Sequence, residues 1–345
     1  MDDVVVIGYG SQRKSDLTGG IVAVGEEKLQ MVTTNNLMDK LAGQIPGMNV
    51  TTSNAKPGED QSLRVRGENS LSADNSPLIV MDGIPYSGSL GDIDPDIIEN
   101  MSVLKDASSA AIYGSRGANG VILIQTKKGK KGAPTVSYKG QVGMQQAQHR
   151  IDMMKGAEYV KYTQDYNRMK YGYSGDQLDP LVLLNPSERA NYQNGSELDW
   201  QDIMFRNALT TSHQIISGGT EATTYMASIS HLREDGVMEN TGLKRTNIAL
   251  NITQVLNKWL TVGMGTQAIQ KEFGGEQPYL EAGLKMSPYG IYKDENDRYV
   301  DYPMDQTLFY NPMANIDATN DKTNRNVFIS TFAEIQFPID GLSFR

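Results

Sequence analysis

The sequence predicts a small mixed α/β domain followed by antiparallel strands of a transmembrane β-barrel, and three observations lead to this fold class. The first 132 residues combine short apolar runs with glycine-rich turns and helix-capping positions. Beyond them, apolar residues recur at every second position, which is the period of a strand whose two faces differ. The connections between these strands also alternate in length, as they do in barrels of outer membranes.

The composition is compatible with a barrel and excludes several other classes of protein. Apolar runs such as Val4–Ile7 fall far short of the ~20 residues of a spanning helix. A mean hydropathy of −0.44 suits a barrel, because only alternate residues of its strands face lipid. The net charge of −9 offers no basic surface to nucleic acid. Because cysteine is absent, disulfides, Cys-ligated zinc and thiol nucleophiles are excluded.

Residues 1–25 are expected to form an extended arm. The apolar run Val4–Ile7 lies among acidic residues and glycines, and no neighbouring segment offers itself as a partner strand. Met1 is followed by Asp2 and Asp3 rather than by a charged-then-apolar leader. We therefore expect that any secretory signal has been removed or left out.

Residues 26–132 are expected to form the mixed α/β domain. A helix is expected around residues 37–41. The glycines and the proline of 43–47 are expected to end it. Asp94 or Asp96 is expected to cap a short helix, and Asp106 to cap another that runs to Tyr113. The strands expected in this domain are residues 48–52, 62–66, 78–81, 101–104 and 121–126.

Residues 133–345 are expected to form the N-terminal part of the barrel. In the first of its strands, Val136, Tyr138 and Val142 share one face while Lys139 and Gln141 share the other. Each strand has about the length that a tilted strand needs to cross a bilayer. The expected strands are residues 135–145, 211–218, 223–231, 246–254, 260–265, 327–337 and the beginning of one at 342–345.

The connections distinguish this barrel from a soluble all-β domain, which has no reason to alternate its loop lengths. Long loops at residues 147–209 and 272–324 are expected outside the cell, and short turns at 219–222, 257–258 and 338–341 in the periplasm. Plugged barrels have about 22 strands, and an open barrel leaves unpaired backbone groups in lipid. Because only six or seven strands are present, we expect the chain to be the N-terminal portion of a longer protein.

Three segments carry a resemblance to a known family. They are DDVVVIGYG at residues 2–10, LAGQIPGMNVTTSNAKPGEDQSLRVRG at 41–67 and DPDIIENMSVLKDASSAAIYGSRGANGVILIQTKKG at 94–129. Together they resemble the plug of SusC/RagA-like TonB-dependent outer-membrane transporters. The resemblance implies a Gram-negative outer membrane, a plug that gates the barrel and energy-coupled uptake of oligosaccharides. It also implies three partners, namely TonB with ExbB/ExbD, a SusD-like surface lipoprotein lid and outer-membrane lipid.

Other functions remain open at this point. Within the same class, the alternatives are an importer of oligopeptides and a receptor for siderophores or cobalamin. A surface receptor or adhesin that does not transport is the alternative from another class. An enzyme is not expected, because no nucleophile and base form a constellation, and His149, His213 and His231 are scattered along the chain without a spaced pair.

The N-terminal apolar segment resembles the TonB box of this family. An extended β-branched run can lend its backbone N–H and C=O groups to the sheet of a partner. The alternative is that the run forms an edge strand of the plug. The residues assigned to TonB binding are Val4, Val5, Val6, Ile7, Gly8, Tyr9 and Gly10.

Two further plug motifs suggest roles for individual residues. Arg64 and Arg66 share one face of a strand, and the resemblance implies that they bond to carboxylates on the barrel wall. The polar loop that follows is expected to point toward the substrate cavity, although a merely solvated hairpin loop is the alternative. Its candidate ligand-facing residues are Asn69, Ser70, Asp74 and Asn75.

No cofactor is expected. Asp92, Asp94 and Asp96 have the spacing of a calcium loop, but Ile97 stands where an EF-hand needs glycine, so helix capping is the better interpretation. In the second long loop, calcium at Asp294, Asn296 and Asp297 is an alternative to solvated charge. Both long loops are rich in tyrosine, which suits sugar faces and peptides but more commonly packs within the loops themselves.

Overall fold

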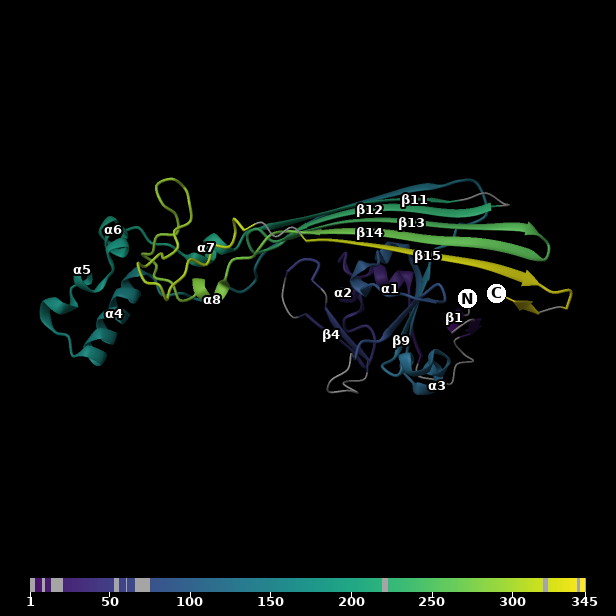
Figure 1. The fold of residues 1–345 in the computed structure, drawn as a ribbon, viewed down its shortest axis with the longest axis horizontal. Coiled ribbons are helices and arrows are strands. Elements are labelled where there is room, and N and C mark those ends of the chain that lie inside the picture. Colours follow the sequence, from purple (N-terminus) through teal and green to yellow (C-terminus); the bar gives the residue numbers. More distant parts are fainter. Residues whose placement is uncertain are drawn as a thin grey trace.

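The computed structural model describes residues 4–7, 10–13, 21–52, 56–59, 61–65, 75–218, 223–318, 322–339 and 342–344. Three parts are visible in Figure 1. A plug domain, residues 21–126, lies against one face of a long antiparallel sheet, which we call the wall. At one end of the wall, residues 146–207 and 274–318 form a third part, which we call the apical module.

The plug domain is built on a five-stranded mixed sheet with the order β3-β8-β9-β6-β7. Only β6 and β9 run parallel. A separate two-stranded ladder joins β4 to β5. The strands are β3 Ile21–Gly25, β4 Met48–Thr51, β5 Ser62–Val65, β6 Leu78–Met81, β7 Ile84–Pro85, β8 Ile98–Leu104 and β9 Val121–Thr126. The predicted strands at 78–81 and 121–126 are confirmed with their bounds.

Short helices connect these strands. They are α1 Glu26–Gln30, α2 Leu37–Leu41, η2 Leu90–Asp92, η3 Pro95–Ile97, α3 Ala107–Ala110 and η4 Ala111–Gly117. Side chains of α2 and of the central strands fill the core, where Leu37, Leu41, Ile98, Met101 and Ile122 are fully buried. The end of the predicted N-terminal arm differs from expectation, because Ile21–Gly25 pairs with β8 as an edge strand of this sheet.

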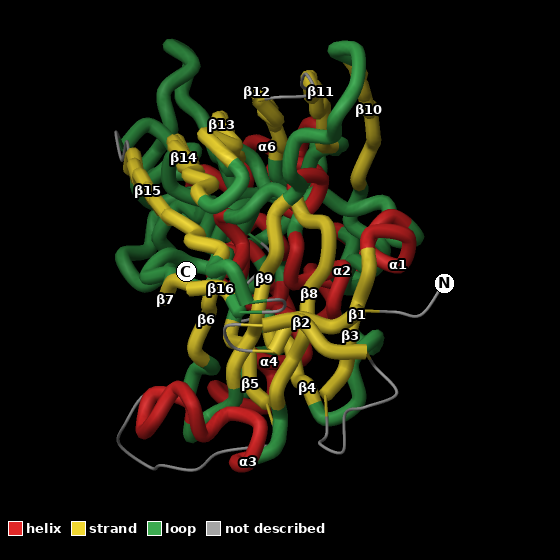
Figure 2. Tube along the Cα trace, turned by 90° about the vertical axis from the view of Figure 1, so that its right-hand side faces the viewer, coloured by secondary structure: helices red, strands yellow, loops and turns green. Residues whose placement is uncertain are grey.

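The wall consists of seven antiparallel strands, each paired with the next along the chain. Seen from one end, they form an arc over the plug domain (Figure 2). The strands are β10 Val136–Gln145, β11 Ala208–Gly218, β12 Thr223–Asp235, β13 Gly242–Asn257, β14 Leu260–Phe273, β15 Lys322–Gln336 and β16 Ser343–Phe344. The predicted order and the start of a seventh strand are confirmed.

Several wall strands are longer than predicted, mainly at the end that carries the apical module. There, polar residues occupy both faces, as Lys244 and Arg245 show on β13 and Lys271 and Glu272 show on β14. The alternation of apolar and polar residues therefore stops before the strand does. Backbone pairing continues, with Lys244 opposite Glu272 and Arg245 opposite Lys271.

The two faces of the wall have the polarity of a membrane protein. On the outer face, exposed apolar side chains include Val136, Ile229, Ile248 and Val327. On the inner face, polar side chains are buried against the plug domain, among them Thr210, Gln214, Ser228, Arg245, Asn247, Gln267 and Lys271. A water-soluble sheet has the opposite arrangement, so this wall is built to face lipid on its outer side.

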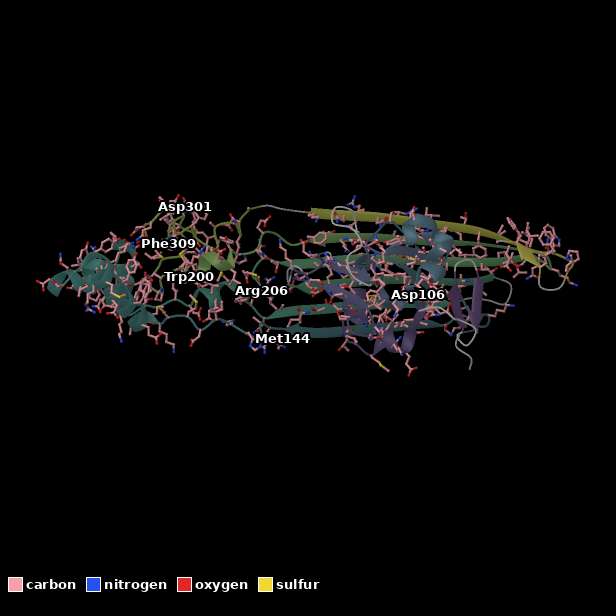
Figure 3. The ribbon with its side chains drawn as sticks, turned by 90° about the horizontal axis from the view of Figure 1, so that it is seen from below. Asp106, Met144, Trp200, Arg206, Asp301 and Phe309 are labelled. Carbon is pink, nitrogen blue, oxygen red and sulfur yellow. The ribbon has the colours of Figure 1, made fainter. Side chains whose placement is uncertain are left out.

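The apical module contains α4 Gly156–Tyr171, η5 Gly175–Leu178, α5 Pro180–Leu183, α6 Pro186–Asn194, α7 Trp200–Met204 and α8 Leu280–Gly283. Its core brings the two long loops together around Trp200, Met204, Met286, Met304 and Met313. The Trp200 indole N–H donates to Ser287 O at 2.8 Å. Figure 3 shows Trp200, Asp301 and Phe309 in this module, far from Asp106 of the plug domain.

No helix among the described residues is both long and apolar enough to cross a membrane. The N-terminal segment forms one further element outside these three parts. It is a two-stranded ladder of β1 Val4–Ile7 and β2 Gly10–Arg13.

Candidate functional site

The plug domain meets the wall through two acidic turns. Asp94 caps η3 by accepting the Asp96 N–H at 3.0 Å, and Asp92 accepts the Ser89 N–H at 3.1 Å in the capping box of η2. The prediction that these aspartates cap helices is therefore confirmed. Because the capping bonds hold the Asp92 and Asp94 carboxylates, they also fix the direction in which these two side chains point.

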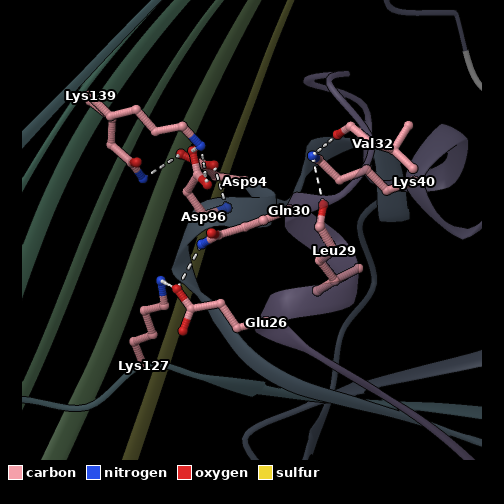
Figure 4. Close-up of polar contacts among 10 residues, drawn as sticks. Glu26, Leu29, Gln30, Val32, Lys40, Asp94, Asp96, Lys127 and Lys139 are labelled. Atoms are coloured by element: carbon pink, nitrogen blue, oxygen red, sulfur yellow. Dashed lines mark hydrogen bonds and ion pairs between the residues drawn. The ribbon is translucent and has the colours of Figure 1, made fainter.

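Basic side chains of the wall bind these carboxylates. Lys271 forms an ion pair with Asp92, and Lys139 Nζ lies 2.9 Å from Asp96 Oδ1. Figure 4 shows Lys139 beside Asp94 and Asp96. The Gln214 amide N–H donates to Asp94 Oδ2 at 3.4 Å. The acidic turns are thus held by side chains from three strands of the wall.

Arg245 completes this interface from the inner face of β13. Its side chain is 5% exposed, and its guanidinium donates to Gly91 O at 2.8 Å and to Asn35 O at 3.0 Å. A buried guanidinium is stable only when its donors are satisfied and negative charge lies nearby. Here two carbonyls satisfy donors, and the acidic turns supply the charge.

A second contact links the end of the plug sheet to the wall. Asp82 accepts the Thr126 N–H at 3.0 Å and the Thr126 hydroxyl at 2.6 Å. Asn251 of β13 in turn donates to Thr126 Oγ1 at 2.9 Å and to Lys127 O at 2.8 Å. This chain of hydrogen bonds anchors the C-terminal end of β9 at the point where the polypeptide leaves the plug domain for the wall.

Tyr86 forms a third contact, this one partly aromatic. Its ring packs edge-on against Phe328 of β15 with centroids 5.6 Å apart, and Asn326 donates to its hydroxyl at 3.4 Å. Burial, and secondarily the charge of Asp92, raise the pKa of the Tyr86 phenol well above its ordinary value. Phe328 also packs against the main core of the plug domain, and the inner wall face carries further buried apolar side chains, namely Met226, Leu232, Leu243, Ala249 and Ile269.

The charges observed at the contact between the plug domain and the wall are arranged differently from those expected. We expected plug arginines to bond to wall carboxylates, whereas here wall cations bind plug carboxylates. Arg64 lies half-buried on β5, and Arg66 lies outside the described residues, so their role stays a prediction. The residues missed were Lys139, Arg245 and Lys271, although their position on the inward strand face was a usable signal.

The N-terminal segment differs from expectation in one respect. The expectation that no neighbour pairs with it is wrong, because β1 pairs with β2, with Val4 opposite Arg13 and Ile7 opposite Gly10. Among the described residues, the other edge of β1 has no strand beside it. Gly8 and Tyr9 lie outside the described residues, and TonB binding by this segment stays a prediction.

Directly after the arm, polar contacts tie α1 to the rest of the plug domain (Figure 4). Buried Lys40 donates to Leu29 O at 2.8 Å and to Val32 O at 2.6 Å, and burial lowers the pKa of its ammonium. Glu26 pairs with Lys127 at 2.7 Å. The start of the plug domain is therefore connected to its core and to the linker that enters β10.

The remaining predicted residues are placed as follows. Of the candidate ligand-facing loop, Asn75 is described and half-buried, while Asn69, Ser70 and Asp74 lie outside the described residues. Their role stays a prediction.

The candidate calcium residues serve an internal turn. Asp294 accepts the backbone N–H groups of Asn296 and Arg298 and the Arg298 guanidinium, while Asp297 pairs with Lys293. No group of three or more metal-ligating His, Asp or Glu side chains occurs in the described part of the chain.

Several loop aromatics pack within the apical module, which is the commoner alternative. Tyr289 is buried, and Tyr292 packs edge-on against Trp200. Other tyrosines are exposed, among them Tyr279, Tyr302 and Tyr310 at 58%, 40% and 49%. At the surface of α4, neighbouring rings lie 5.6–6.3 Å apart, and Tyr162, Tyr166 and Tyr171 are 52%, 38% and 56% exposed. We call these three residues and Tyr173 the tyrosine ladder. Lys170 Nζ lies 4.9 Å from the centre of the Tyr166 ring.

Comparison with known proteins gives consistent relatives. The family described as TonB-dependent Receptor Plug Domain matches residues 13–121. TonB-dependent receptor SusC of Bacteroides thetaiotaomicron is 33% identical over 365 aligned positions, which cover 95% of this chain and 34% of the relative. TonB-dependent receptor P26 of Formosa agariphila is 32% identical, with 96% of this chain and 33% of the relative covered.

Among solved structures, the RagAB peptide importer in its open-open state matches 99% of this chain and 41% of its own, with a TM-score of 0.82 and 30% identity. The match includes both the plug domain and the wall. The chain spans about a third of the length of these curated relatives.

Proposed function

The chain belongs to the SusC/RagA-like TonB-dependent receptors of the outer membrane, and from this premise we propose that the complete receptor imports oligosaccharides by energy-coupled transport. The plug domain blocks the pore, and a pull from TonB on the N-terminal segment remodels it. The family is non-enzymatic. The apical module, on this proposal, lies outside the cell.

The observation that carries the gating step is the polar interface between the plug domain and the wall. Lys139, Gln214, Arg245 and Lys271 of the wall bind the plug through hydrogen bonds and ion pairs, and Phe328 packs against the main plug core. When the plug shifts, these groups exchange their partners for water, and the net contribution of a hydrogen bond to a charged group is about 1.5–3 kcal/mol. A plug held in this way can shift while its polar groups stay hydrogen-bonded, to water in place of the wall.

The N-terminal ladder supports the coupling step. TonB adds a strand to the open edge of β1, where about four backbone hydrogen bonds of roughly 1 kcal/mol each give a directional grip. Along the chain, the next strand after the pulled segment is β3, which is an edge strand of the plug sheet. An edge strand can separate from its single neighbour one hydrogen bond at a time, so the force acts first on β3 and α1.

The tyrosine ladder supports the choice of substrate. Flat, exposed rings stack on the apolar faces of sugars, and they lie in the module that faces the exterior. Oligopeptides are the second candidate, because the solved structure that this chain matches along almost its whole length is a peptide importer. A SusD-like lipoprotein that covers the apical module is the proposed lid.

The test is uptake by cells that produce the full-length receptor with its neighbouring lipoprotein. Energy-dependent accumulation of a labelled oligosaccharide mixture, abolished by a protonophore, supports the proposal. Accumulation of labelled oligopeptides alone would replace the substrate class. Binding without accumulation of either pool would assign the protein to the non-transporting receptors or adhesins.

A further inference from the structure

On β12 to β15 the outer face of the wall changes from apolar to polar near the apical module, whereas on β10 and β11 it stays apolar at Val142, Met144 and Leu209. Strand register aligns one row of outward-facing residues, most of them apolar, across six strands. The row is Tyr138, Ile215, Ile229, Ile248, Ala268 and Val327. Tyr138 and Val327 are 64% and 62% exposed, so this row faces the surroundings directly.

One register step closer to the module, the aligned row is mostly polar. It consists of Gly140, His213, His231, Thr246, Gln270 and Arg325. Two of the three histidines expected to be scattered, His213 and His231, are thus direct cross-strand neighbours. Hydrogen bonds fix the row, from Tyr138 Oη to His213 Nδ1 at 2.7 Å, from His231 Nδ1 to Thr246 Oγ1 at 3.0 Å, and from Arg325 Nε to Gln270 Oε1 at 3.1 Å.

In the next row, which consists of Val142, Thr211, Arg233, Lys244, Glu272 and Thr323, the three central positions are charged. Arg233 lies directly opposite Lys244, and Lys244 lies directly opposite Glu272. The two carboxylates on this part of the face already have donors, since Asp235 accepts from Arg233 Nε at 3.3 Å and Glu272 accepts from Gln270 Nε2 at 2.7 Å. Lys244 has no hydrogen-bond or ion-pair partner among the residues that the structure describes.

Two like charges directly opposite each other on one strand face destabilise the pair unless an anion lies between them. Arg233 and Lys244 have this arrangement, and Arg325 adds a third exposed cation two strands from Lys244. With strands about 4.8 Å apart and a two-residue step of about 6.8 Å, Lys244 and Arg325 are separated by roughly 12 Å at the backbone. An extended headgroup spans that distance.

We propose that Arg233, Lys244 and Arg325 form a binding surface for the phosphate groups of lipid headgroups in the extracellular leaflet. This surface adjoins the apolar part of the outer face that contacts the hydrocarbon. The boundary between the apolar row and the polar row therefore sets its position along the membrane normal. Guanidinium groups bind phosphate through paired N–H donors, and ammonium binds it as a compact charge. With the apical module outside the cell, as proposed above, this boundary faces the outer leaflet.

The test uses the full-length receptor in detergent and native mass spectrometry with diphosphoryl lipid A. The triple variant Arg233→Gln, Lys244→Gln and Arg325→Gln is expected to retain about tenfold less lipid A, as the loss of charge-assisted contacts requires. The matched control is Lys285→Gln with Arg298→Gln, which removes exposed cations from the apical module. This control is expected to retain lipid A like the unaltered receptor, and phosphatidylcholine is expected to bind weakly to all three proteins.

Heat-modifiable migration on gels verifies that each barrel is folded. Should the triple variant misfold, Lys244→Gln alone decides the question, because it removes no hydrogen bond or ion pair among the described residues, and a loss of about threefold is expected. Equal retention of lipid A by the unaltered receptor and the folded variants overturns the proposal. Equal retention of phosphatidylcholine and lipid A, or a co-purifying protein displaced by the variants, overturns it too.

Discussion

Lys271 of the wall and Asp92 of the plug domain form an ion pair whose side chains are only 6% and 15% exposed. The same Asp92 carboxylate accepts the Ser89 N–H in the capping box of η2. One carboxylate therefore both shapes the plug turn and binds the wall. Because the capping hydrogen bond forms within the plug domain, the turn is preorganised for docking before the wall is met.

The first prediction concerns this pair. Lys271→Met leaves a buried carboxylate without its cation, and the plug should open more easily by about 3 kcal/mol. Hydrogen exchange of plug amides in the full-length receptor measures the change, and leakage of a large antibiotic into cells should rise with it. The matched control is Lys285→Met, because the Lys285–Glu281 pair is 60% and 62% exposed and exposed pairs contribute little.

Adding Asp92→Asn to Lys271→Met tests the same point from the other side. The amide keeps an acceptor for the Ser89 N–H and carries no charge, so the double variant should regain most of the lost protection. Protection that stays as low as in the single variant would contradict an electrostatic lock.

The second prediction concerns Lys40. Its ammonium donates to Leu29 O and Val32 O inside the plug domain, so Lys40→Met should lower the protection of α1 and β3 amides. Loss of hydrogen bonds from a charged donor costs about 1.5–3 kcal/mol. Hydrogen exchange that stays unchanged at α1 but falls elsewhere would contradict this local role.

The pH dependence of the Lys40 contribution has a definite sign. Burial lowers the pKa of Lys40 in the folded plug from an ordinary value of 10.5. Between that lowered pKa and 10.5, the unfolded chain binds more protons than the folded one, so stability rises with pH. The stability of the unaltered plug relative to Lys40→Met should therefore increase across this window, measured by denaturant titrations at several alkaline pH values.

The alternation of side chains along the strands explains what the sequence predicts well. Val136, Tyr138 and Val142 alternate with Lys139 and Gln141, and this alternation identified the outer and inner faces of β10 before any partner was known. The order of the wall strands followed from the short turns, because a short connection leaves antiparallel pairing as the simplest geometry.

Contacts between distant segments could not be predicted in the same way. Arg245 donates to Gly91 and Asn35, which lie 154 and 210 positions away. The sequence marks Arg245 only as an inward-facing charge, and a charge of that kind fits many partners. The pairing of β1 with β2 was missed because the strands have four residues each, too few to show a period.

The third prediction concerns the N-terminal segment. Val5→Pro removes a backbone N–H and prevents regular strand pairing, so energy-dependent uptake should be lost while ligand binding to the receptor is retained. Uptake of a labelled oligosaccharide pool and binding to the purified full-length receptor give the two readouts. Val5→Thr keeps the N–H and the β-branched shape and should transport normally. Normal uptake by Val5→Pro would contradict coupling through strand addition.

The fourth prediction separates the tyrosine ladder from the core of the apical module. Tyr166 lies between Tyr162 and Tyr171 at the surface, whereas Tyr289 is 4% exposed. Tyr166→Ala should weaken oligosaccharide binding about tenfold, equivalent to about 1.4 kcal/mol, with little change in the stability of the module. Calorimetric binding and thermal unfolding of the full-length receptor measure the two effects.

Tyr289→Ala provides the contrast, because it removes a buried ring and should destabilise the module by about 3–5 kcal/mol. Tyr166→Phe keeps the flat ring and should bind oligosaccharide nearly as well as the unaltered receptor. This comparison isolates stacking, since the phenylalanine variant loses only the hydroxyl. If Tyr166→Ala binds the oligosaccharide as tightly as Tyr166→Phe, the ladder takes no part in recognition, and the apical surface that contacts the substrate lies elsewhere.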